Sequence, residues 1–363
     1  MGTAARVLVV NAGSSSLKLR VLDGDDHVVA SGDEPPDDRD ALQRFVSSGG
    51  AVDAVGHRVV HGGHDMVQPC RVDAEVLARL EALVPLAPLH QPAAIAGIRS
   101  LQRLLPDVPS VACFDTAFHA TITTAASTYP LPREWRDRFG LRRFGFHGLS
   151  HAYAARRAGE VLGRPVHRLV TCHLGAGSSI AAVVEGSCVD TTMGFTPNEG
   201  VPMATRSGSV DVGMLTWLLD AGLPEPELAD GLQHRSGLLG LAGTADMREV
   251  EAAAGAGQPD AVVAREVWLH RVTQAIAAMA TSAEGIDALV FTGGIGEHSA
   301  DLRGGIAERL TWLGVALDRD ANGLRGDREI TGIGASVRSA VIEAREDIEI
   351  ARGTRAAIGS VQH

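Results

Sequence analysis

The stretch that decides the fold is Val7-Leu-Val-Val-Asn-Ala-Gly-Ser-Ser-Ser-Leu-Lys-Leu-Arg-Val-Leu22. Two runs of β-forming residues flank a turn of glycine and serine, which predicts a β-hairpin. The tip of such a hairpin presents backbone N–H groups, hydroxyls and the Lys18 ammonium to one point, which suits a phosphate chain with its metal. A tight turn of small residues would explain the glycine and serines alone, but Asn11 and Lys18 favour a phosphate site. The Gly-Lys-Ser/Thr order of a Walker loop is absent.

The same pattern recurs in the second half of the chain. Val170-Thr-Cys-His-Leu-Gly-Ala-Gly-Ser-Ser-Ile-Ala-Ala-Val-Val184 again runs from strand through turn to strand. Matching Gly13 to Gly175 gives an offset of 162 positions (175 − 13), and the same offset aligns Ser16 with Ser178. Similarity at this spacing predicts two domains of one design, because a solenoid has a far shorter period. The arrangement resembles the actin, Hsp70 and sugar-kinase superfamily, in which two facing hairpins hold a nucleotide.

We therefore expect an α/β protein of duplicated actin-like (ribonuclease H-like) ATPase domains, with mixed sheets flanked by helices and a central cleft. Residues 1–148 with about 343–363 are expected to form the first domain, and residues 149–342 the second. Hydrophobic spacing predicts the remaining elements. Residues 31–40 are expected to be a polar surface loop. The expected strands include 51–56, 109–115, 287–292 and 336–342, and the expected helices are 72–84, 95–105, 150–162, 210–219, 246–254, 261–283 and 347–358.

Composition limits the class of protein. The chain has 363 residues, of which 45% are hydrophobic and 21% charged, and a formal net charge of −11. This length suffices for two domains, and the negative charge disfavours a nucleic-acid partner. The sequence shows neither an apolar stretch long enough for a membrane span nor a signal-peptide pattern. Cys70, Cys113, Cys172 and Cys188 form no C-x-x-C pair, so we expect buried thiols and a cytoplasmic protein.

A cluster of polar residues surrounds position 60. His57, His61 and His64 suggest zinc, but the spacing is not H-E-x-x-H and no Cys or Glu completes a ligand set. Hydrogen-bonding roles around a tight turn are therefore the favoured interpretation. Arg58 differs, because an arginine just after a predicted strand and beside Gly62-Gly63 is placed to clamp an anion with two hydrogen bonds.

Four other places are candidates for function. Asp115 ends a predicted buried strand, and ligands of α/β proteins gather at the carboxyl ends of strands. His147 precedes a predicted helix, where Ser150 is explained equally well as a structural cap. Arg206 stands in the turn Thr205-Arg-Ser-Gly208, where a solvated surface arginine is the usual explanation. The turn Gly293-Gly-Ile-Gly-Glu297 leads from a strand into a helix and is a familiar, though by itself weak, nucleotide signal.

Taken together, the motifs resemble those of the acetate/propionate kinase family, in the family's order and over nearly the whole chain. They are Asn11-Ala-Gly-Ser-Ser-Ser-Leu-Lys18, Gly56-His-Arg-Val-Val-His-Gly-Gly63, Ala87-Pro-Leu-His90, Phe114-Asp-Thr-Ala-Phe-His119, Phe144-Gly-Phe-His-Gly-Leu-Ser-His151, Thr205-Arg-Ser-Gly208 and Gly294-Ile-Gly-Glu297. The resemblance implies reversible, ATP-dependent phosphorylation of a short-chain carboxylate, above all acetate, to acyl phosphate and ADP by in-line transfer with magnesium (Mg²⁺). It also implies a homodimer.

The resemblance further implies roles for individual residues. Asn11 and Glu346 lie near the magnesium, Arg58 and Arg206 bind the carboxylate and the phosphoryl group, Asp115 is the essential acid and His147 steadies the transition state. The acyl pocket is implied to contain Val60, Leu89, Phe146 and Pro197, together with Arg58. Contacts with ATP are implied for Lys18, Ser14, Ser16, His173, Gly175, Gly177, Asp246, Met247, Arg248, Gly294, Ile295, Gly296, Glu297 and His298. The first domain is thereby expected on the side of the acyl substrate and the second on that of the nucleotide.

The chemistry of these residues suits the reaction. A carboxylic acid of pKa about 4 to 5 is already ionised at neutral pH, so the obstacle is repulsion between anions rather than a missing base. Magnesium, two arginines, a lysine and a histidine answer that obstacle. We therefore expect Asp115 to order magnesium and its waters rather than to accept a proton. The small apolar pocket predicts a modest preference for acetate over propionate.

The sequence departs from the family's pattern at a few positions. The chain is shorter between the first hairpin and Gly56. Ala176 and Gln91 stand where Asn is usual, Ser209 stands where Asp is usual, and Arg345 stands where a neutral or acidic residue is common. The principal catalytic positions are filled, so an active kinase is expected. The alternatives are a propionate-preferring kinase, a non-catalytic nucleotide-binding module of the same fold, and a zinc hydrolase that uses the histidines near residue 60.

Overall fold

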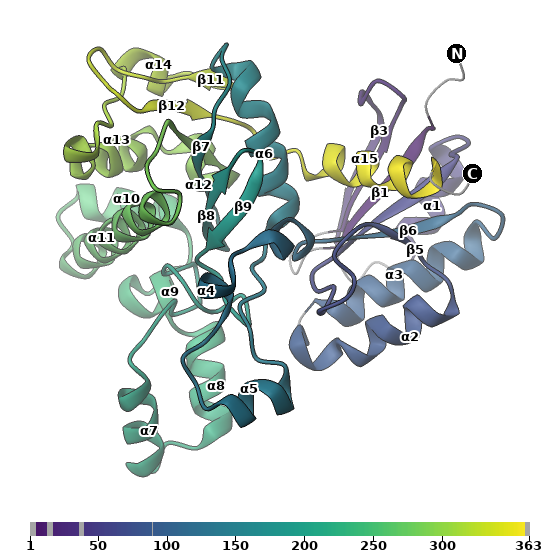
Figure 1. Cartoon of the computed structure of the whole chain (residues 1–363), viewed down its shortest axis with the longest axis horizontal. Helices are drawn as coiled ribbons and strands as arrows, with labels where there is room; N and C mark the ends of the chain where they lie inside the picture. The colour runs from purple at the N-terminus through teal and green to yellow at the C-terminus, as the bar shows by residue number, and fades with distance from the viewer. Residues whose placement is uncertain (1–4, 13–16, 36–39, 89, 360–363) are drawn as a thin grey trace. The chain divides into compact units, whose positions relative to one another are not determined.

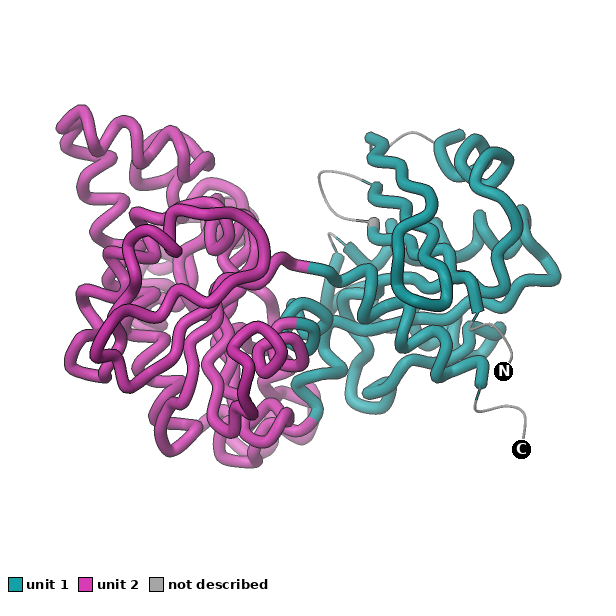
Figure 2. Tube along the Cα trace, turned by 90° about the horizontal axis from the view of Figure 1, so that it is seen from above, with its two compact units in different colours: residues 1–120, 146–153, 345–363 teal, residues 121–145, 154–344 magenta. Residues whose placement is uncertain are grey.

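The computed structural model describes residues 5–12, 17–35, 40–88 and 90–359. The chain divides into two compact units, shown in teal and magenta in Figure 2. Unit 1 comprises residues 1–120, 146–153 and 345–363, and unit 2 comprises residues 121–145 and 154–344. The domain limits expected from the sequence stay a prediction beside this division, as does the cleft.

Unit 1 is built on a six-stranded mixed sheet. Its strands are β1 (Val7–Ala12), β2 (Leu17–Leu22), β3 (Val28–Glu34), β4 (Ala54–Val59), β5 (Cys70–Arg71) and β6 (Ser110–Phe114), in the order β3-β2-β1-β4-β6-β5. The central strands β1, β4 and β6 are parallel, whereas β2, β3 and β5 pair antiparallel with their neighbours. The helices of this unit are α1 (Ala41–Ser48), α2 (Ala74–Ala82), α3 (Gln91–Leu104) and α15 (Glu346–Gly359), with short 3₁₀ turns at Val84–Leu86 and Ala117–Thr121.

Unit 2 repeats this design. Its strands are β7 (Arg168–Leu174), β8 (Ser178–Val184), β9 (Ser187–Thr191), β10 (Ala288–Thr292), β11 (Arg328–Glu329) and β12 (Arg338–Val341), in the order β11-β12-β10-β7-β8-β9. Read from β9, this order matches unit 1 strand for strand, with the same parallel core and antiparallel flanks. The expected fold of two duplicated mixed sheets is confirmed.

Helices flank the second sheet as they do the first (Figure 1). They are α4 (Thr124–Ser127), α5 (Arg133–Phe139), α7 (Val212–Asp220), α8 (Glu225–His234), α9 (Gly237–Ala242), α10 (Met247–Gly255), α11 (Pro259–Ser282), α12 (Gly293–His298), α13 (Ala300–Arg309) and α14 (Arg319–Gly323), with a 3₁₀ turn at Thr311–Leu313. Helix α6 (Gly148–Val161) begins in unit 1 and continues into unit 2. The core of unit 2 centres on the fully buried Trp268 of α11 and Phe291 of β10.

The two glycine and serine hairpins are not identical. Ala12 pairs with Leu17 across the first turn, and Leu174 pairs with Ser178 across the second, so the second turn is one residue shorter. Ser178 therefore corresponds in register to Leu17, and the predicted match with Ser16 is wrong. A constant offset cannot describe two turns of different length, although it holds through the strands that precede them.

Unit 1 differs from the local predictions in three places. Strand β3 runs to Glu34, so residues 31–34 are not loop; they pair with β2. Helix α1, which follows, was not predicted. Strand β4 runs to Val59 and therefore contains Arg58, which was expected just beyond the strand.

Two further observations concern the whole described chain. Its four cysteines are all free, and Cys113, Cys172 and Cys188 are buried, as expected, whereas Cys70 is half-buried. Within the described ranges, every helix is too short or too polar to cross a bilayer.

Candidate active site

Three parallel strands of unit 1 end side by side with polar residues. Asn11 lies near the end of β1, Arg58 near the end of β4, and Asp115 directly follows β6. The register pairs Val10 of β1 with His57 of β4, so Asn11 and Arg58 are neighbours across the sheet. The carboxyl edge of the parallel strands thus collects the polar groups, as is usual for ligand sites in α/β proteins.

Side-chain alternation decides the face on which these groups lie. Val55 of β4 packs in the core cluster that includes α3. On the opposite face, a Cβ added at Gly56 would lie 2.7 Å from Ile350 Cγ2 of α15, so only a glycine lets the helix approach this closely. Arg58, two residues after Gly56, therefore shares the face covered by α15. Figure 1 shows α15 across this sheet, and its first residue is Glu346.

The four polar side chains form one network. Arg58 donates from Nε to Asp115 Oδ1 and Oδ2, at 3.1 Å each, and from Nη2 to Oδ2 at 2.6 Å. Its Nη1 donates to Asn11 Oδ1 at 3.1 Å and lies 3.6 Å from Glu346 Oε2. Asn11 Nδ2 donates to the same Glu346 oxygen at 2.8 Å. The structure therefore brings Asn11, Arg58, Asp115 and Glu346 together.

Burial and charge set the protonation of this network. The Asp115 side chain is 1% exposed, and burial raises its pKa, an effect that Arg58 opposes. Burial works to lower the pKa of Arg58, but the carboxylates of Asp115 and Glu346 raise it above its ordinary value. Arg58 thus remains a guanidinium cation, and two acids share one positive charge.

His147 is held next to this network by a close backbone approach. Gly148 N donates to Asp115 O at 2.9 Å, and a Cβ at Gly148 would lie 2.2 Å from that oxygen. His147 itself has φ 57°, a left-handed conformation that is uncommon outside glycine. A non-glycine residue in such a conformation, directly before α6, is a strained position of the kind that functional sites retain.

The residues predicted for the acyl pocket in unit 1 are only partly described. Val60 and Phe146 are buried, and the rings of Phe146 and His61 meet edge-on at 5.6 Å. His119 Nε2 lies 2.9 Å from the Phe146 carbonyl oxygen, which fixes the backbone before His147. Leu89 lies outside the described residues.

The first hairpin contributes one described phosphate candidate. Lys18 of β2 pairs directly with Asn11 of β1 and is exposed, so its side chain lies on the same face of the hairpin as the Asn11 amide. Ser14 and Ser16 lie outside the described residues.

In unit 2 the second hairpin lies against the start of α12. A Cβ at Gly175 would lie 3.7 Å from Gly294 N, and one at Gly293, where φ is 78°, would lie 2.8 Å from the Leu174 carbonyl oxygen. His173 of β7 pairs with Thr292 of β10, directly before α12. The predicted ATP residues of these two segments therefore gather at one edge of the second sheet, Gly177, Ile295, Gly296 and His298 among them.

Glu297 connects α12 to the end of the unit. Its Oε1 accepts hydrogen bonds from Gly293 N at 2.9 Å and from Ala344 N at 2.9 Å. The first bond fixes the glycine-rich turn, and the second fixes the segment that leads from β12 to Glu346. The structure thus shows a positioning contact for this residue.

Helix α10 carries the third predicted ATP segment. Asp246 is its N-cap and accepts from Arg248 N at 2.9 Å, while the exposed Arg248 side chain pairs with the same carboxylate. The bonds from the Arg248 side chain and backbone lower the pKa of Asp246 to about 2. Met247 packs into the core of unit 2, so only its main chain is left for a ligand.

Arg206 is half-buried. Its Nη1 lies 3.4 Å from the Pro197 carbonyl oxygen and 3.8 Å from Met203 Sδ, and among the described residues no Asp or Glu forms an ion pair with it. Burial lowers its pKa from the ordinary value. A partly buried guanidinium without a carboxylate partner is equipped to bind an anion.

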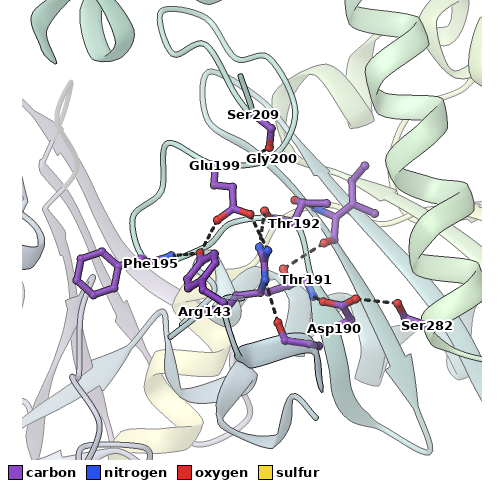
Figure 3. Close-up of polar contacts among 12 residues, drawn as sticks. Arg143, Asp190, Thr191, Thr192, Phe195, Glu199, Gly200, Ser209 and Ser282 are labelled. Atoms are coloured by element: carbon purple, nitrogen blue, oxygen red, sulfur yellow. Dashed lines mark hydrogen bonds and ion pairs between the residues drawn. The ribbon is translucent and has the colours of Figure 1, made fainter. Parts of the chain in front are cut away.

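A charged cluster that the sequence did not reveal surrounds the loop bearing Pro197. Arg143, Tyr129 and Glu199 contact one another and the loop backbone, as Figure 3 shows for Arg143 and Glu199. Arg143 stands beside the recognised motif at Phe144, but nothing in its local pattern distinguishes it from a surface arginine. Gly194, within the loop, could have pointed to this cluster, because a glycine often stands where a neighbouring group approaches too closely for a Cβ.

The histidines near residue 60 have structural surroundings. Burial lowers the pKa of His57 to about 3 and, together with the charge of His64, that of His61 to about 4. His61 Nδ1 accepts from Gly63 N at 2.9 Å, as expected for a tight turn. Across the described ranges, the only group of three or more His, Cys, Asp and Glu side chains close enough to share a metal is Asp23, Asp25 and His27.

The residues that depart from the family's pattern have local partners. Gln91 is fully buried and donates to the His61 carbonyl oxygen at 3.1 Å. Ser209 is bonded to Gly200 in both directions, donating from its N at 2.8 Å and accepting at Oγ at 3.1 Å. Arg345 pairs with Asp347, two residues along. These side chains therefore stabilise the backbone on which the candidate residues stand.

This chain is similar to known proteins over most of its length. The model of the Acetokinase family matches residues 40–352. An acetate kinase of Carboxydothermus hydrogenoformans is 40% identical over 390 residues, covering 96% of this chain and 98% of the relative. An acetate kinase of Deinococcus deserti is 48% identical over 311 residues, covering 84% and 78%. Two solved structures at 34% identity have a TM-score of 0.90: an acetate kinase of Porphyromonas gingivalis, covering 98% and 100%, and a propionate kinase of Francisella tularensis, covering 97% and 99%.

Proposed function

This chain belongs to the acetokinase family, and we propose on that premise that it transfers the γ-phosphoryl group of ATP to acetate. The reaction gives acetyl phosphate and ADP and is reversible. The observation that carries the proposal is the joint presence of a tightly bonded Arg58 beside Asp115 and Glu346 and of an Arg206 that no described carboxylate neutralises. These are the cations that anionic reactants require.

The transfer needs no general base. Acetate is an anion at neutral pH and attacks the γ-phosphorus directly, while the bond from that phosphorus to the bridging oxygen of ADP breaks. Repulsion between the carboxylate and the triphosphate is the main barrier that the protein must lower. Guanidinium groups act best here, because their planar donors match carboxylate and phosphoryl oxygens. We assign this role to Arg58 and Arg206, with His147 as a further donor to the phosphoryl oxygens.

The donor chemistry in unit 1 fits magnesium. Asn11 and Glu346 offer an amide oxygen and a carboxylate oxygen, and hard divalent cations prefer such ligands. We assign these two residues to Mg²⁺, with Asp115 ordering its water ligands. Bound there, the ion would neutralise charge on the phosphate oxygens of ATP.

Asp115 has a second role in this proposal. Its carboxylate accepts three hydrogen bonds from Arg58 and fixes the direction in which the remaining guanidinium N–H groups point. Burial raises the pKa of Asp115, but protonation of its carboxylate would break the ion pair with Arg58. Asp115 therefore orients Arg58 and does not serve as a base.

Nucleotide binding is assigned mainly to unit 2. We propose that the second hairpin, through His173, Gly175 and Gly177, and the start of α12 contact ATP, with further contacts from Asp246, Arg248 and the main chain of Met247. Gly294 leaves its surroundings open, since a Cβ there would meet nothing within 4 Å, which suits an adenosine group. Lys18, Ser14 and Ser16 of the first hairpin are assigned to the phosphates.

The acyl pocket is assigned to Val60, Leu89, Phe146 and Pro197. Large buried side chains such as Phe146, which is 1% exposed, leave little room for a longer chain. A methylene that fits contributes about 0.8 kcal/mol, so acetate is favoured over propionate by a modest factor. A propionate-preferring enzyme remains the second candidate, and the similarity to a propionate kinase structure is the observation in its favour.

A kinetic panel with ATP and acetate, propionate or butyrate tests the proposal, with acyl phosphate trapped as the hydroxamate. We expect the highest kcat/KM for acetate and complete loss of activity on removal of Mg²⁺. Highest kcat/KM for propionate would establish the second candidate. ATP binding by calorimetry without any acyl phosphate would establish a non-catalytic module. Stoichiometric zinc in the purified protein, with activity indifferent to Mg²⁺, would point to a hydrolase.

We further propose a cytoplasmic homodimer. Helix α7 supports the dimer, because it exposes an apolar surface unusual for a monomer: the exposed fractions are 75% for Val212 and 65% for Trp217. Light scattering should give twice the chain mass. Trp217→Glu should shift the mass toward the monomer, and a dimer unaffected by this change would place the interface elsewhere.

A further inference from the structure

We propose that Arg143, Tyr129 and Glu199, here called the loop clamp, are positioning residues that set the acyl-chain selectivity of the enzyme. They act on the loop of residues 192–200, which bears Pro197. The inference rests on the proposed function, because Pro197 is assigned there to the acyl pocket. None of the three clamp residues is assigned to contact substrate.

Glu199 is the centre of the clamp. Its Oε1 accepts from Arg143 Nη2 at 2.6 Å, and its Oε2 accepts a short hydrogen bond from the Tyr129 hydroxyl. The same hydroxyl oxygen accepts from Phe195 N at 2.8 Å. The Arg143 guanidinium carbon also lies 5.7 Å from the centre of the Tyr129 ring. Each member therefore contacts the other two. Tyr129 also fixes the middle of the loop, through its bond with Phe195.

The clamp also holds the beginning of the loop. Arg143 Nη1 donates to the Thr192 carbonyl oxygen at 2.9 Å, and Nε donates to the Ala126 carbonyl oxygen at 3.3 Å. Figure 3 shows the Arg143 side chain between Thr192 and Glu199, with dashed contacts to both. Arg143 thus ties the two ends of the loop to each other through a single guanidinium.

The side chains of the loop clamp pack closely against the loop backbone. A Cβ added at Gly194 would lie 1.7 Å from Glu199 Oε2 and 2.1 Å from the Tyr129 hydroxyl oxygen. The Gly194 carbonyl oxygen in turn accepts from Phe144 N at 3.1 Å. The clamp therefore fixes the loop against the segment of unit 2 that contains Phe144.

Pro197 lies on the part of the loop that the clamp encloses, between Phe195 and Glu199. Its carbonyl oxygen accepts a hydrogen bond from Arg206 Nη1 at 3.4 Å. Gly200, at the far end, is bonded to Ser209, in the segment that contains Arg206. A displaced loop would therefore move the pocket wall and disturb the Arg206 environment together.

The chemistry of the clamp explains why side chains are needed here. Residues 192–211 contain neither helix nor strand, so backbone ladders do not fix their position. The Arg143 and Glu199 side chains are 17% and 32% exposed, and partly buried ion pairs with good geometry impose a definite arrangement. Loss of either charged partner leaves the other charge without compensation, and loss of the Tyr129 hydroxyl leaves the Phe195 N–H without its acceptor, so the loop must shift to rehydrate these groups.

The test uses the full-length enzyme with Tyr129→Phe and Glu199→Gln and the panel of acetate, propionate and butyrate. We expect the acetate KM to rise by about 10-fold and the ratio of kcat/KM for propionate to that for acetate to rise by about 3- to 10-fold, because a loosened pocket rejects the extra methylene less well. The KM for ATP should stay within about 2-fold of wild type. Asp327→Asn is the matched control, because it removes the carboxylate partner of the partly buried Arg157 elsewhere in unit 2; its acyl ratio should equal that of wild type.

Equal loss of activity on all three carboxylates, with an unchanged acyl ratio, would overturn the inference and leave the clamp a purely structural feature. A rise of the ATP KM alone would overturn it as well. Wild-type enzyme that phosphorylates no carboxylate would instead refute the proposed function. If Glu199→Gln does not fold, Tyr129→Phe decides, because it removes one hydroxyl and keeps the charges.

Discussion

Arg58 donates to both oxygens of the Asp115 carboxylate, and the 2.6 Å bond from Nη2 is the shortest of the three. Arg58 lies in β4 and Asp115 directly follows the neighbouring parallel strand β6, so the two are 57 positions apart in the chain. Their pairing joins two separate candidates, because the Asp115 carboxylate orients the Arg58 guanidinium and the guanidinium opposes the effect of burial on the pKa of Asp115. This relationship determines what their substitution should do.

Asp115→Asn should lower kcat by about 10²-fold or more, because the carboxamide cannot hold the guanidinium with charged hydrogen bonds. The pH dependence of the remaining activity should have the same shape as that of wild type, since we assign no proton transfer to Asp115. Steady-state kinetics between pH 5 and 9 will test this. Loss of one limb of the wild-type profile in the variant would show that Asp115 is a base.

Arg58→Met and Arg206→Met should separate stability from catalysis. Both should lower kcat strongly, by about 10³-fold, because each removes a cation from the reacting phosphoryl group. Their stabilities should differ. Arg58→Met leaves buried Asp115 uncompensated and should cost about 3–5 kcal/mol of unfolding free energy, whereas Arg206→Met removes a half-buried charge without a described ion pair and should be neutral or stabilising.

Urea unfolding and kinetics on the same preparations measure both quantities. Arg157→Met, which removes a partly buried arginine outside the site, is the control for loss of a charge and should retain activity. Equal destabilisation by Arg58→Met and Arg206→Met would contradict the difference in their environments.

Glu297 should tolerate loss of its negative charge but not loss of the side-chain oxygen that accepts two hydrogen bonds. Glu297→Gln keeps an acceptor for Gly293 N and Ala344 N and should stay within about 2-fold of wild type, whereas Glu297→Ala loses two hydrogen bonds of about 1 kcal/mol each and should raise the ATP KM by about 10-fold or more. Glu308→Ala, at an exposed position of α13, is the control. If Glu297→Gln is as defective as Glu297→Ala, the carboxylate charge itself acts on the nucleotide.

The buried His57 should make the protein acid-sensitive. Burial lowers its pKa to about 3 in the folded state, while the unfolded chain binds the proton below about pH 6.5. Unfolding therefore takes up a proton in this window, so the free energy of unfolding falls as the pH drops from about 6.5 toward 3, by up to about 1.4 kcal/mol per pH unit.

His57→Leu removes this contribution and should flatten the dependence of unfolding free energy on pH. Urea titrations at pH 7, 6 and 5 measure the slope. The same slope in wild type and variant would mean that His57 protonates without penalty in the folded protein.

Much of the architecture could be predicted from local sequence. The strand-turn-strand pattern of Val7–Leu22 and its repeat predict two hairpins that the structure contains, because alternation and turn residues act over a few positions. Helical spacing likewise predicts α11, which differs from its expected bounds by one or two residues at each end. The extent of β3 and the length of the second turn were missed, since strand pairing, not composition, ends a strand.

The sequence by itself determined the duplicated α/β design, the family and the identity of the candidate residues, because motifs and periodicity are written in consecutive positions. Only the tertiary structure decided how these residues combine. Strand register and the packing of Gly56 under α15 brought Arg58, Asp115, Asn11 and Glu346 to one place, and burial assigned Met247 to the core. The loop clamp was also decided by the tertiary structure, because Glu199 is distant in sequence from Tyr129 and Arg143 and meets them only when the chain folds.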